Sequence, residues 1–112
     1  MKSVPLAELS YATFVELLHS KFRVRGSAPA PVEIELVEVT AHQSGQAQSG
    51  NFALVFTGPL HQFLPQGTYL FEHEKLRAFD LFIVPVGKDQ KGFRYEAVFN
   101  RLIQPEALLK PV

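Results

Sequence analysis

The chain of 112 residues contains no cysteine and no excess of charge of either sign. Without cysteine, disulfides, thiolate metal ligands and a cysteine nucleophile are all excluded. Eleven basic residues balance eleven acidic ones, so the formal net charge is zero. Because a nucleic-acid-binding protein normally carries a basic excess that neutralises phosphates, we expect no nucleic-acid partner.

Long hydrophobic runs are also missing. No apolar stretch approaches the roughly eighteen residues of a membrane span, and MKSVPLAELSYATF lacks the apolar centre of a secretory signal peptide. We therefore expect no membrane partner and a cytoplasmic protein, with later export as part of an assembly left open.

What the chain does contain is hydrophobic material, at 46% of its residues, with ten phenylalanines. That content is typical of a folded chain rather than a disordered one, and the length suits one domain that needs no metal or disulfide support. We expect a single domain over residues 1–100 and a C-terminal arm over 101–112.

The first element expected is a short helix. Apolar residues at positions 11, 14, 15, 17 and 18 fall on one helical face, and Ser10 is placed to cap its N-terminus. The helix should end near His19 or Lys21, because the following FRVR alternates like a strand.

Residues 22–25 and 32–36 predict a β-hairpin across the breaker-rich GSAPAP. A register that pairs Val24 with Ile34 on the apolar face also pairs Arg25 with Glu33 on the polar face. The same register places Phe22 opposite Leu36 and Arg23 opposite Glu35. The charges are thereby explained without a ligand.

Further strands follow. The apolar alternation changes phase at Leu36, which predicts a β-bulge there, and residues 51–58 (NFALVFTG) suit a strand buried on both faces. Residues 43–51 have little apolar anchorage and predict a flexible loop. Residues 59–66 form another loop, whose apolar side chains should pack on a barrel end or against a partner.

The last part of the domain predicts two hairpins, formed by residues 68–72, 79–87 and 92–100. We expect the last two strands to pair Ile83 with Tyr95, Leu81 with Ala97 and Phe79 with Phe99, and on the other face Val84 with Arg94 and Phe82 with Glu96. Tyr95 then points inward, while Arg94 and Glu96 point outward. Pro85 cannot donate to a ladder, so its strand should be bulged or at a sheet edge there.

From PLHQFLPQGTYLFEH through LFIVPVGKDQKGFRYEAVFN, the chain resembles a small bacterial domain family of unknown function. The family phrase reads approximately LPQG.Y..EH, then LF.VPVG, then RYEAVFN, with Phe14, Phe22 and Val24 matching upstream. Glu74 stands where the family often has proline, and the chain continues past Asn100. The resemblance implies no reaction, and it suggests an association with phage-tail-like or collar-type genes.

Candidate chemistry is sparse. None of the four histidines lies in an HxH, HxxxH or HExxH pattern, and in a strand or turn His73 would point away from Glu72 and Glu74. Glu33, Glu35, Asp80, Arg94 and Glu96 could in principle perform acid–base work, but each is explained as part of a solvated sheet face. We expect no enzyme, no cofactor and no metal site.

The sequence predicts a mainly β fold, an antiparallel six-stranded barrel or barrel-like sandwich with a short N-terminal helix. We expect a non-catalytic structural or interaction module that binds itself, as a homo-oligomer, or another assembly protein. An unpaired edge near Pro85 and two apolar segments favour this function. A small-ligand-binding barrel is the alternative. The candidate interaction residues are Leu60, Phe63, Leu64, Leu102, Ile103, Leu108 and Leu109.

Overall fold

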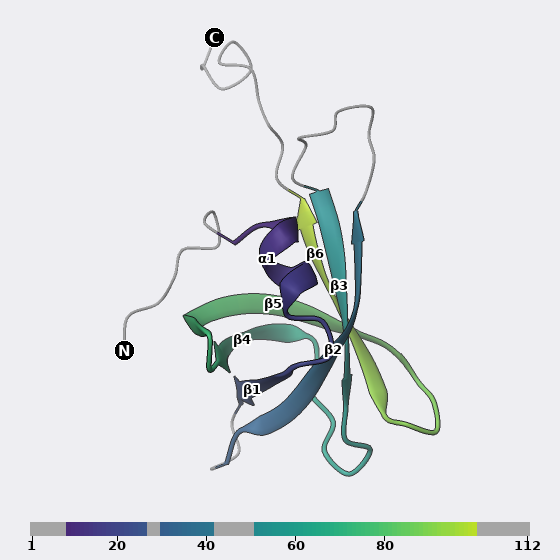
Figure 1. Cartoon of the computed structure of the whole chain (residues 1–112). Coiled ribbons are helices and arrows are strands. Elements are labelled where there is room, and N and C mark those ends of the chain that lie inside the picture. Colours follow the sequence, from purple (N-terminus) through teal and green to yellow (C-terminus); the bar gives the residue numbers. More distant parts are fainter. Residues whose placement is uncertain (1–8, 27–29, 42–50, 101–112) are drawn as a thin grey trace, which may run out of the picture.

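The computed structural model describes residues 9–26, 30–41 and 51–100. These ranges form the elements α1 (Tyr11–Glu16), β1 (Lys21–Arg25), β2 (Val32–Ala41), β3 (Asn51–Gly58), β4 (Gly67–His73), β5 (Leu76–Lys88) and β6 (Phe93–Asn100). The strands close into an antiparallel barrel in the order β1-β2-β3-β6-β5-β4 (Figure 1). The predicted mainly β fold with a short N-terminal helix is confirmed, and the six strands form a barrel.

The predicted arm at 101–112 and residues 43–50 of the loop predicted at 43–51 lie outside the described residues, so the expectations placed there stay predictions, while Asn51 begins β3. Within the described ranges, no helix has the length and apolar character needed to cross a membrane.

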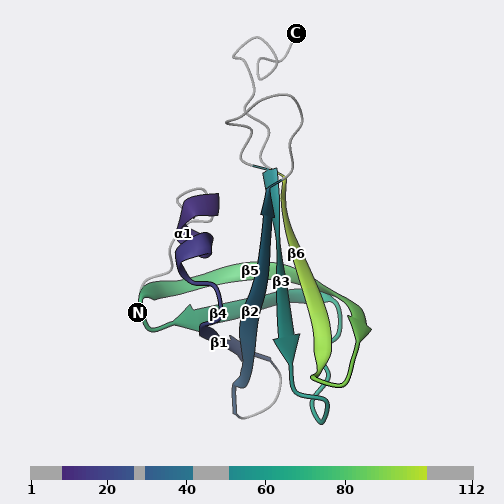
Figure 2. The same cartoon turned by 45° about the vertical axis from the view of Figure 1, so that its right-hand side comes forward.

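Two groups of strands make up the barrel wall. β2, β3 and β6 stand side by side as a tall ribbon, and β4 and β5 cross it at a steep angle (Figure 2). β5 pairs with β6 only from Val84 onward, opposite Glu96. Before that point β5 pairs with β4 alone among the described strands, so the wall opens between the first half of β5 and the far end of β6.

Helix α1 closes this opening. Ser10 caps it as expected, with its hydroxyl accepting a hydrogen bond from the Thr13 N–H at 3.2 Å. The one fully buried helical side chain is Phe14, whose ring centroid lies 5.9 Å from Phe52, 6.1 Å from Phe79 and 5.5 Å from Phe99. A single aromatic residue therefore fills the gap in the wall.

The helix is shorter than predicted, ending at Glu16 rather than near His19 or Lys21. The Leu17 N–H bonds three residues back, to the Phe14 carbonyl, and His19 takes a left-handed φ of 68°. The His19 N–H then donates to the Leu36 carbonyl at 2.7 Å, so β2 competes successfully for the donor that another helical turn would use.

The first hairpin forms, but the predicted register is wrong by two residues. Phe22 lies opposite Ile34, not Leu36, and Val24 lies opposite Val32. A two-residue slip keeps every side chain on its own face, so alternation alone cannot detect it. The predicted pairing of Arg25 with Glu33 and of Arg23 with Glu35 is wrong as well. Both arginines instead contact Glu72, which barrel closure brings beside β1.

The predicted bulge near Leu36 is confirmed by a register shift between Leu36 and Glu38. β3 is buried on both faces over Phe52, Ala53 and Leu54, as its apolar run indicated. The bulge bends β2 so that its first half closes the barrel with β1 and its second half continues up the ribbon with β3.

The β5–β6 hairpin also forms in a register shifted from the predicted one. Val84 faces Glu96 instead of Arg94, and Pro85 faces Tyr95, which was expected opposite Ile83. The ladder between β5 and β6 begins only at Val84, so the predicted pairs of Leu81 with Ala97, Phe79 with Phe99 and Phe82 with Glu96 are wrong as well. The expected bulge lies between Pro85 and Gly87, but the expected free edge there is absent, because this part of β5 pairs with β6 in a closed barrel.

The facing of β6 is as predicted. Tyr95 and Ala97 are buried, while Arg94 and Glu96 lie on the outer surface. The interior is filled by closely packed rings, with centroid separations of 5.4–6.3 Å among Phe22, Phe56 and Phe71. These three rings are therefore core side chains.

Candidate functional site

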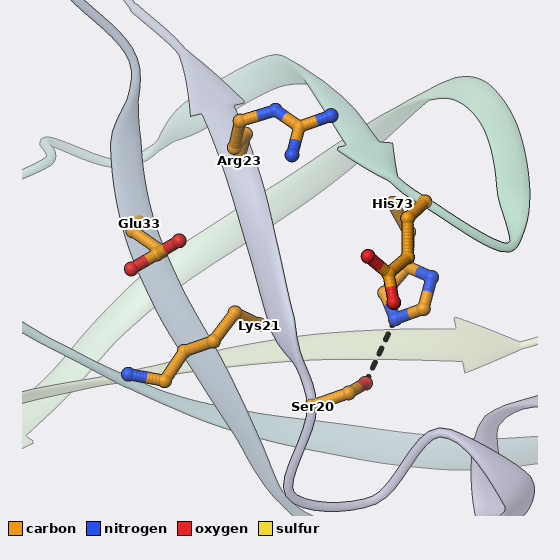
Figure 3. A pocket seen from close by; sticks show the side chains of 6 residues that line it. Ser20, Lys21, Arg23, Glu33 and His73 are labelled. Atoms are coloured by element: carbon orange, nitrogen blue, oxygen red, sulfur yellow. Dashed lines mark hydrogen bonds between the residues drawn. The ribbon is translucent and has the colours of Figure 1, made fainter.

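A polar depression lies on the barrel surface where the start of β1 meets the β4–β5 turn (Figure 3). Its volume is about 380 Å³, and it is lined by Ser20, Lys21, Arg23, Glu33, His73 and Glu74. The Ser20 hydroxyl oxygen lies 2.8 Å from Nε2 of His73. A serine within hydrogen-bond reach of a histidine is the first half of a nucleophile–base pair. Whether His73 can act as a base toward Ser20 therefore depends on which of the two groups donates this hydrogen bond.

The backbone of the turn fixes that direction. The Lys75 N–H donates to Nδ1 of His73 over 3.0 Å. A neutral imidazole whose Nδ1 accepts carries its proton on Nε2, so Nε2–H donates to Ser20. The Ser20 hydroxyl donates in turn to the Leu17 carbonyl. The serine proton thus points away from the imidazole, which in this arrangement cannot remove it.

Burial lowers the pKa of His73 below its ordinary value of 6.5, with the nearby Lys75 and Arg23 acting in the same direction and Glu74 opposing them. The neutral ring packs against Phe22, with 4.6 Å between ring centroids. The hydrogen bonds from Lys75 through His73 and Ser20 to Leu17 tie the β4–β5 turn to the end of α1. We call this four-residue chain the His73 clamp.

The acidic residues considered for acid–base chemistry are distributed over outer faces. Glu33 lines the depression with His73 but is exposed, and in Figure 3 its carboxylate lies on the Lys21 side, away from the imidazole. Glu35 lies 3.5 Å from His19. Within the described ranges, no group of three or more His, Asp or Glu side chains is placed to hold a metal ion.

Arg94 and Glu96 lie two positions apart on the same outer face, and Arg94 lines a second depression of about 280 Å³ together with His19, Glu35 and Asp89. The Arg94 guanidinium lies 3.9 Å from Glu38 and 3.7 Å from Asp89. Both contacts are with partly exposed side chains, so each contributes little to stability. The RYE motif is a strand segment, with one ring inside the barrel and two charges outside.

The second candidate region is the loop over residues 59–66, at the barrel end where β3 stops. Leu64 is only 4% exposed and belongs to the core, whereas Leu60 and Phe63 are 48% and 49% exposed. The Leu64 N–H donates to the buried Tyr95 hydroxyl at 2.9 Å, and the Tyr69 hydroxyl donates to the Pro65 carbonyl at 2.6 Å. The loop is therefore held at its C-terminal end.

Outside that anchor, the loop presents an apolar surface. The Phe63 ring packs edge-on against Phe93, with 5.0 Å between centroids, and the Lys88 ammonium lies 5.8 Å from the Phe93 ring centre. We call Leu60, Phe63 and Phe93, with Lys88 at their border, the loop tip.

The predicted interaction residues thus separate into three groups. Leu60 and Phe63 are available on the surface. Leu64 is buried, so its part in any association is to hold the loop rather than to meet a partner. Leu102, Ile103, Leu108 and Leu109 lie outside the described residues.

The His73 clamp was not foreseen from the sequence. Ser20 and His73 lie far apart in the chain and become neighbours only because β1 pairs with β4 when the barrel closes. The only sequence signal was the position of His73 at the end of an alternating strand, where it falls on the same face as Phe71.

These features define a small closed β-barrel with an aromatic core, a plugging helix and an apolar loop tip. A family model described as a domain of unknown function (DUF6916) matches residues 9–99, and the chain belongs to that family. No curated protein and no solved structure matches the chain significantly.

Proposed function

We propose that this protein is a non-catalytic structural or interaction module that self-associates, as a subunit of a filamentous or phage-tail-like assembly. The observation that carries the proposal is the loop tip, where about half of the surface of both Leu60 and Phe63 is exposed beside a buried anchor.

Anchoring matters because association has an entropic cost. Ordering a flexible loop on binding costs free energy for every immobilised side chain, and a loop already fixed in place avoids most of that cost. Leu64 and Tyr95 fix one end of this loop inside the barrel. Aromatic side chains held rigidly at a surface are typical of the residues that dominate protein–protein binding.

The core packing supports an interaction module over the alternative of an internal ligand site. Ligand-binding barrels keep an internal cavity, whereas here Phe22, Phe56, Phe71 and Phe79 are fully buried against one another along the barrel. The direction of the His73 clamp likewise supports a non-catalytic role for the one serine–histidine pair described.

Sedimentation velocity of the full chain over a range of concentrations tests the proposal. We expect the wild type to associate, and Leu60→Ser/Phe63→Ser to shift the distribution toward monomer. Tyr11→Ser/Val15→Ser is the matched control, because it removes two similarly exposed apolar side chains from α1 instead. A wild type that stays monomeric at high concentration would refute the proposal, as would equal effects of the two double variants in samples that circular dichroism shows to be folded.

A further inference from the structure

A second exposed apolar surface lies on the side of the barrel. Phe82 is 49% exposed and Val98 is 59% exposed. Val84 and Glu96 are paired, Phe82 precedes Val84 by two residues, and Val98 follows Glu96 by two residues. Each exposed residue therefore lies on the same outer face of its strand as the paired residue. We call Phe82, Val84 and Val98 the β5–β6 stripe.

The loop tip and the stripe lie at different places along the same strands. Phe93 is opposite Gly58 at one end of the β3–β6 ladder, and Val98 is near the other end, opposite Ala53. Five residues of extended strand separate Phe93 from Val98, which is about 17 Å. In Figure 1 the loop after β3 lies at the bottom of the barrel, and the end of β6 lies at its top. The two surfaces are therefore too far apart for a single residue of a partner to contact both.

The two surfaces carry opposite charges at their borders. Lys88 borders the loop tip, while Asp80 and Glu96 border the stripe on β5 and β6. In the described part of the chain, none of these three side chains is in an ion pair. Arg94, which lies near Lys88 in the hairpin, is already engaged by Glu38 and Asp89.

We infer that the loop tip of one copy binds the β5–β6 stripe of a second copy, with Lys88 of the first facing Asp80 and Glu96 of the second. This inference rests on the proposed self-association and specifies its geometry. An interface between two different surfaces of the same chain is heterologous, so each copy keeps one free surface of each kind and the assembly continues as a ring or a filament. Complementary charges at the border fix the orientation and disfavour tip-to-tip contact.

The test uses two capping variants of the full chain. Leu60→Asp places a charge in the loop tip, and Val98→Asp places one in the stripe; both positions are exposed, so both variants should fold. We expect each variant alone to be monomeric in sedimentation velocity. Mixed in equal amounts, they should form a dimer that grows no further, because only the intact tip of one and the intact stripe of the other can meet.

Charge reversal gives an independent measurement. Lys88→Glu and Asp80→Lys should each weaken association at least tenfold at low salt, and the double variant Lys88→Glu/Asp80→Lys should recover most of the loss. Failure of the double variant to recover association would contradict the facing of these two residues.

The outcomes separate this inference from the proposed function. A monomeric wild type would overturn both. A wild type that associates and is broken by Leu60→Asp but not by Val98→Asp would keep the self-association and replace our geometry with tip-to-tip contact. Mixed capping variants that stay monomeric, although each is folded, would also overturn the heterologous interface.

Discussion

The hydroxyl of Tyr95, fully buried in β6, accepts a hydrogen bond from the backbone N–H of Leu64 at 2.9 Å. The strand that carries the RYE motif is thereby joined to the loop that presents the apolar tip. No strand covers residues 59–66, so this anchor rather than a regular ladder holds the C-terminal end of the loop.

Removing the Tyr95 hydroxyl should loosen the loop. Tyr95→Phe leaves the Leu64 N–H without its acceptor, and an unsatisfied buried donor costs about 1–3 kcal/mol. We expect the free energy of unfolding in urea to fall by that amount. Phe93→Tyr is the control, because it adds a hydroxyl to a half-buried neighbouring ring without removing a hydrogen bond. Unchanged stability of Tyr95→Phe would contradict the anchor.

The same tyrosine predicts alkaline sensitivity. Burial raises the pKa of Tyr95 above its ordinary value of 10.0, with the Leu64 hydrogen bond partly opposing the shift. The folded protein disfavours the phenolate, so the neutral Tyr95 side chain contributes to the free energy of unfolding. This contribution is complete below pH 10 and is lost as the pH rises through the folded pKa. The midpoint of thermal unfolding should fall between pH 8 and 11, and the fall should be smaller in Tyr95→Phe than in the wild type.

The His73 clamp predicts sensitivity to acid. Burial lowers the pKa of His73, so the folded state prefers the neutral ring, and a proton on Nδ1 would face the Lys75 N–H. The stabilisation is therefore complete above the unfolded pKa of 6.5 and is lost as the pH falls toward the folded value. We expect His73→Gln to be less stable at pH 7.5 and to lose less on acidification. A wild type equally stable at pH 7.5 and 5 would contradict this.

Two glycines with the same backbone angle form a matched pair. Gly92 has φ 158° and Gly87 has φ 159°, so a side chain placed at either position meets a similar backbone cost. A Cβ at Gly92 would lie 2.0 Å from the Gly58 carbonyl oxygen, whereas a Cβ at Gly87 would have nothing within 4 Å. We expect Gly92→Ala to lower the midpoint of thermal unfolding markedly more than Gly87→Ala. Equal shifts would show that the close approach of the two backbones is not needed.

The plugging helix depends on one ring. Phe14→Ala removes the contacts with Phe52, Phe79 and Phe99, and truncation of a buried phenylalanine costs about 3–5 kcal/mol. Val15→Ala, at the next and exposed position, should cost less than about 0.5 kcal/mol. Chemical denaturation measures both. A small effect of Phe14→Ala would mean that the barrel wall closes without the helix.

The positions of the strands could be predicted from the alternation of apolar and polar residues and from the turn residues between strands. The bulges near Leu36 and Pro85 could be predicted in the same way. Alternation assigns each residue to a face and marks where the phase changes. It cannot fix register to better than two residues, which is why Phe22 and Tyr95 each face a residue other than the one predicted. Which residue pairs with which was decided by the closure of the barrel.

The candidate sites divide in the same way. Leu60 and Phe63 were identifiable from the sequence, because a loop with so many apolar residues must pack some of them on the barrel end or against a partner. Leu64 could not be told apart from them, since its burial depends on a hydroxyl thirty-one positions away. The stripe was not recognised because the predicted register placed Phe82 opposite Glu96, whereas the observed pair of Val84 with Glu96 directs Phe82 toward Val98.

The seam between β1 and β4 has a kinetic consequence. Arg23 and Glu72 are paired although they are 49 positions apart, so the ladder that closes the barrel joins segments remote in the chain. Proteins dominated by such distant pairings fold on a scale of about milliseconds to seconds. Until the seam forms, newly made chains expose backbone hydrogen-bonding groups of β1 and β4 to one another, and dilute refolding should give a higher yield than concentrated refolding.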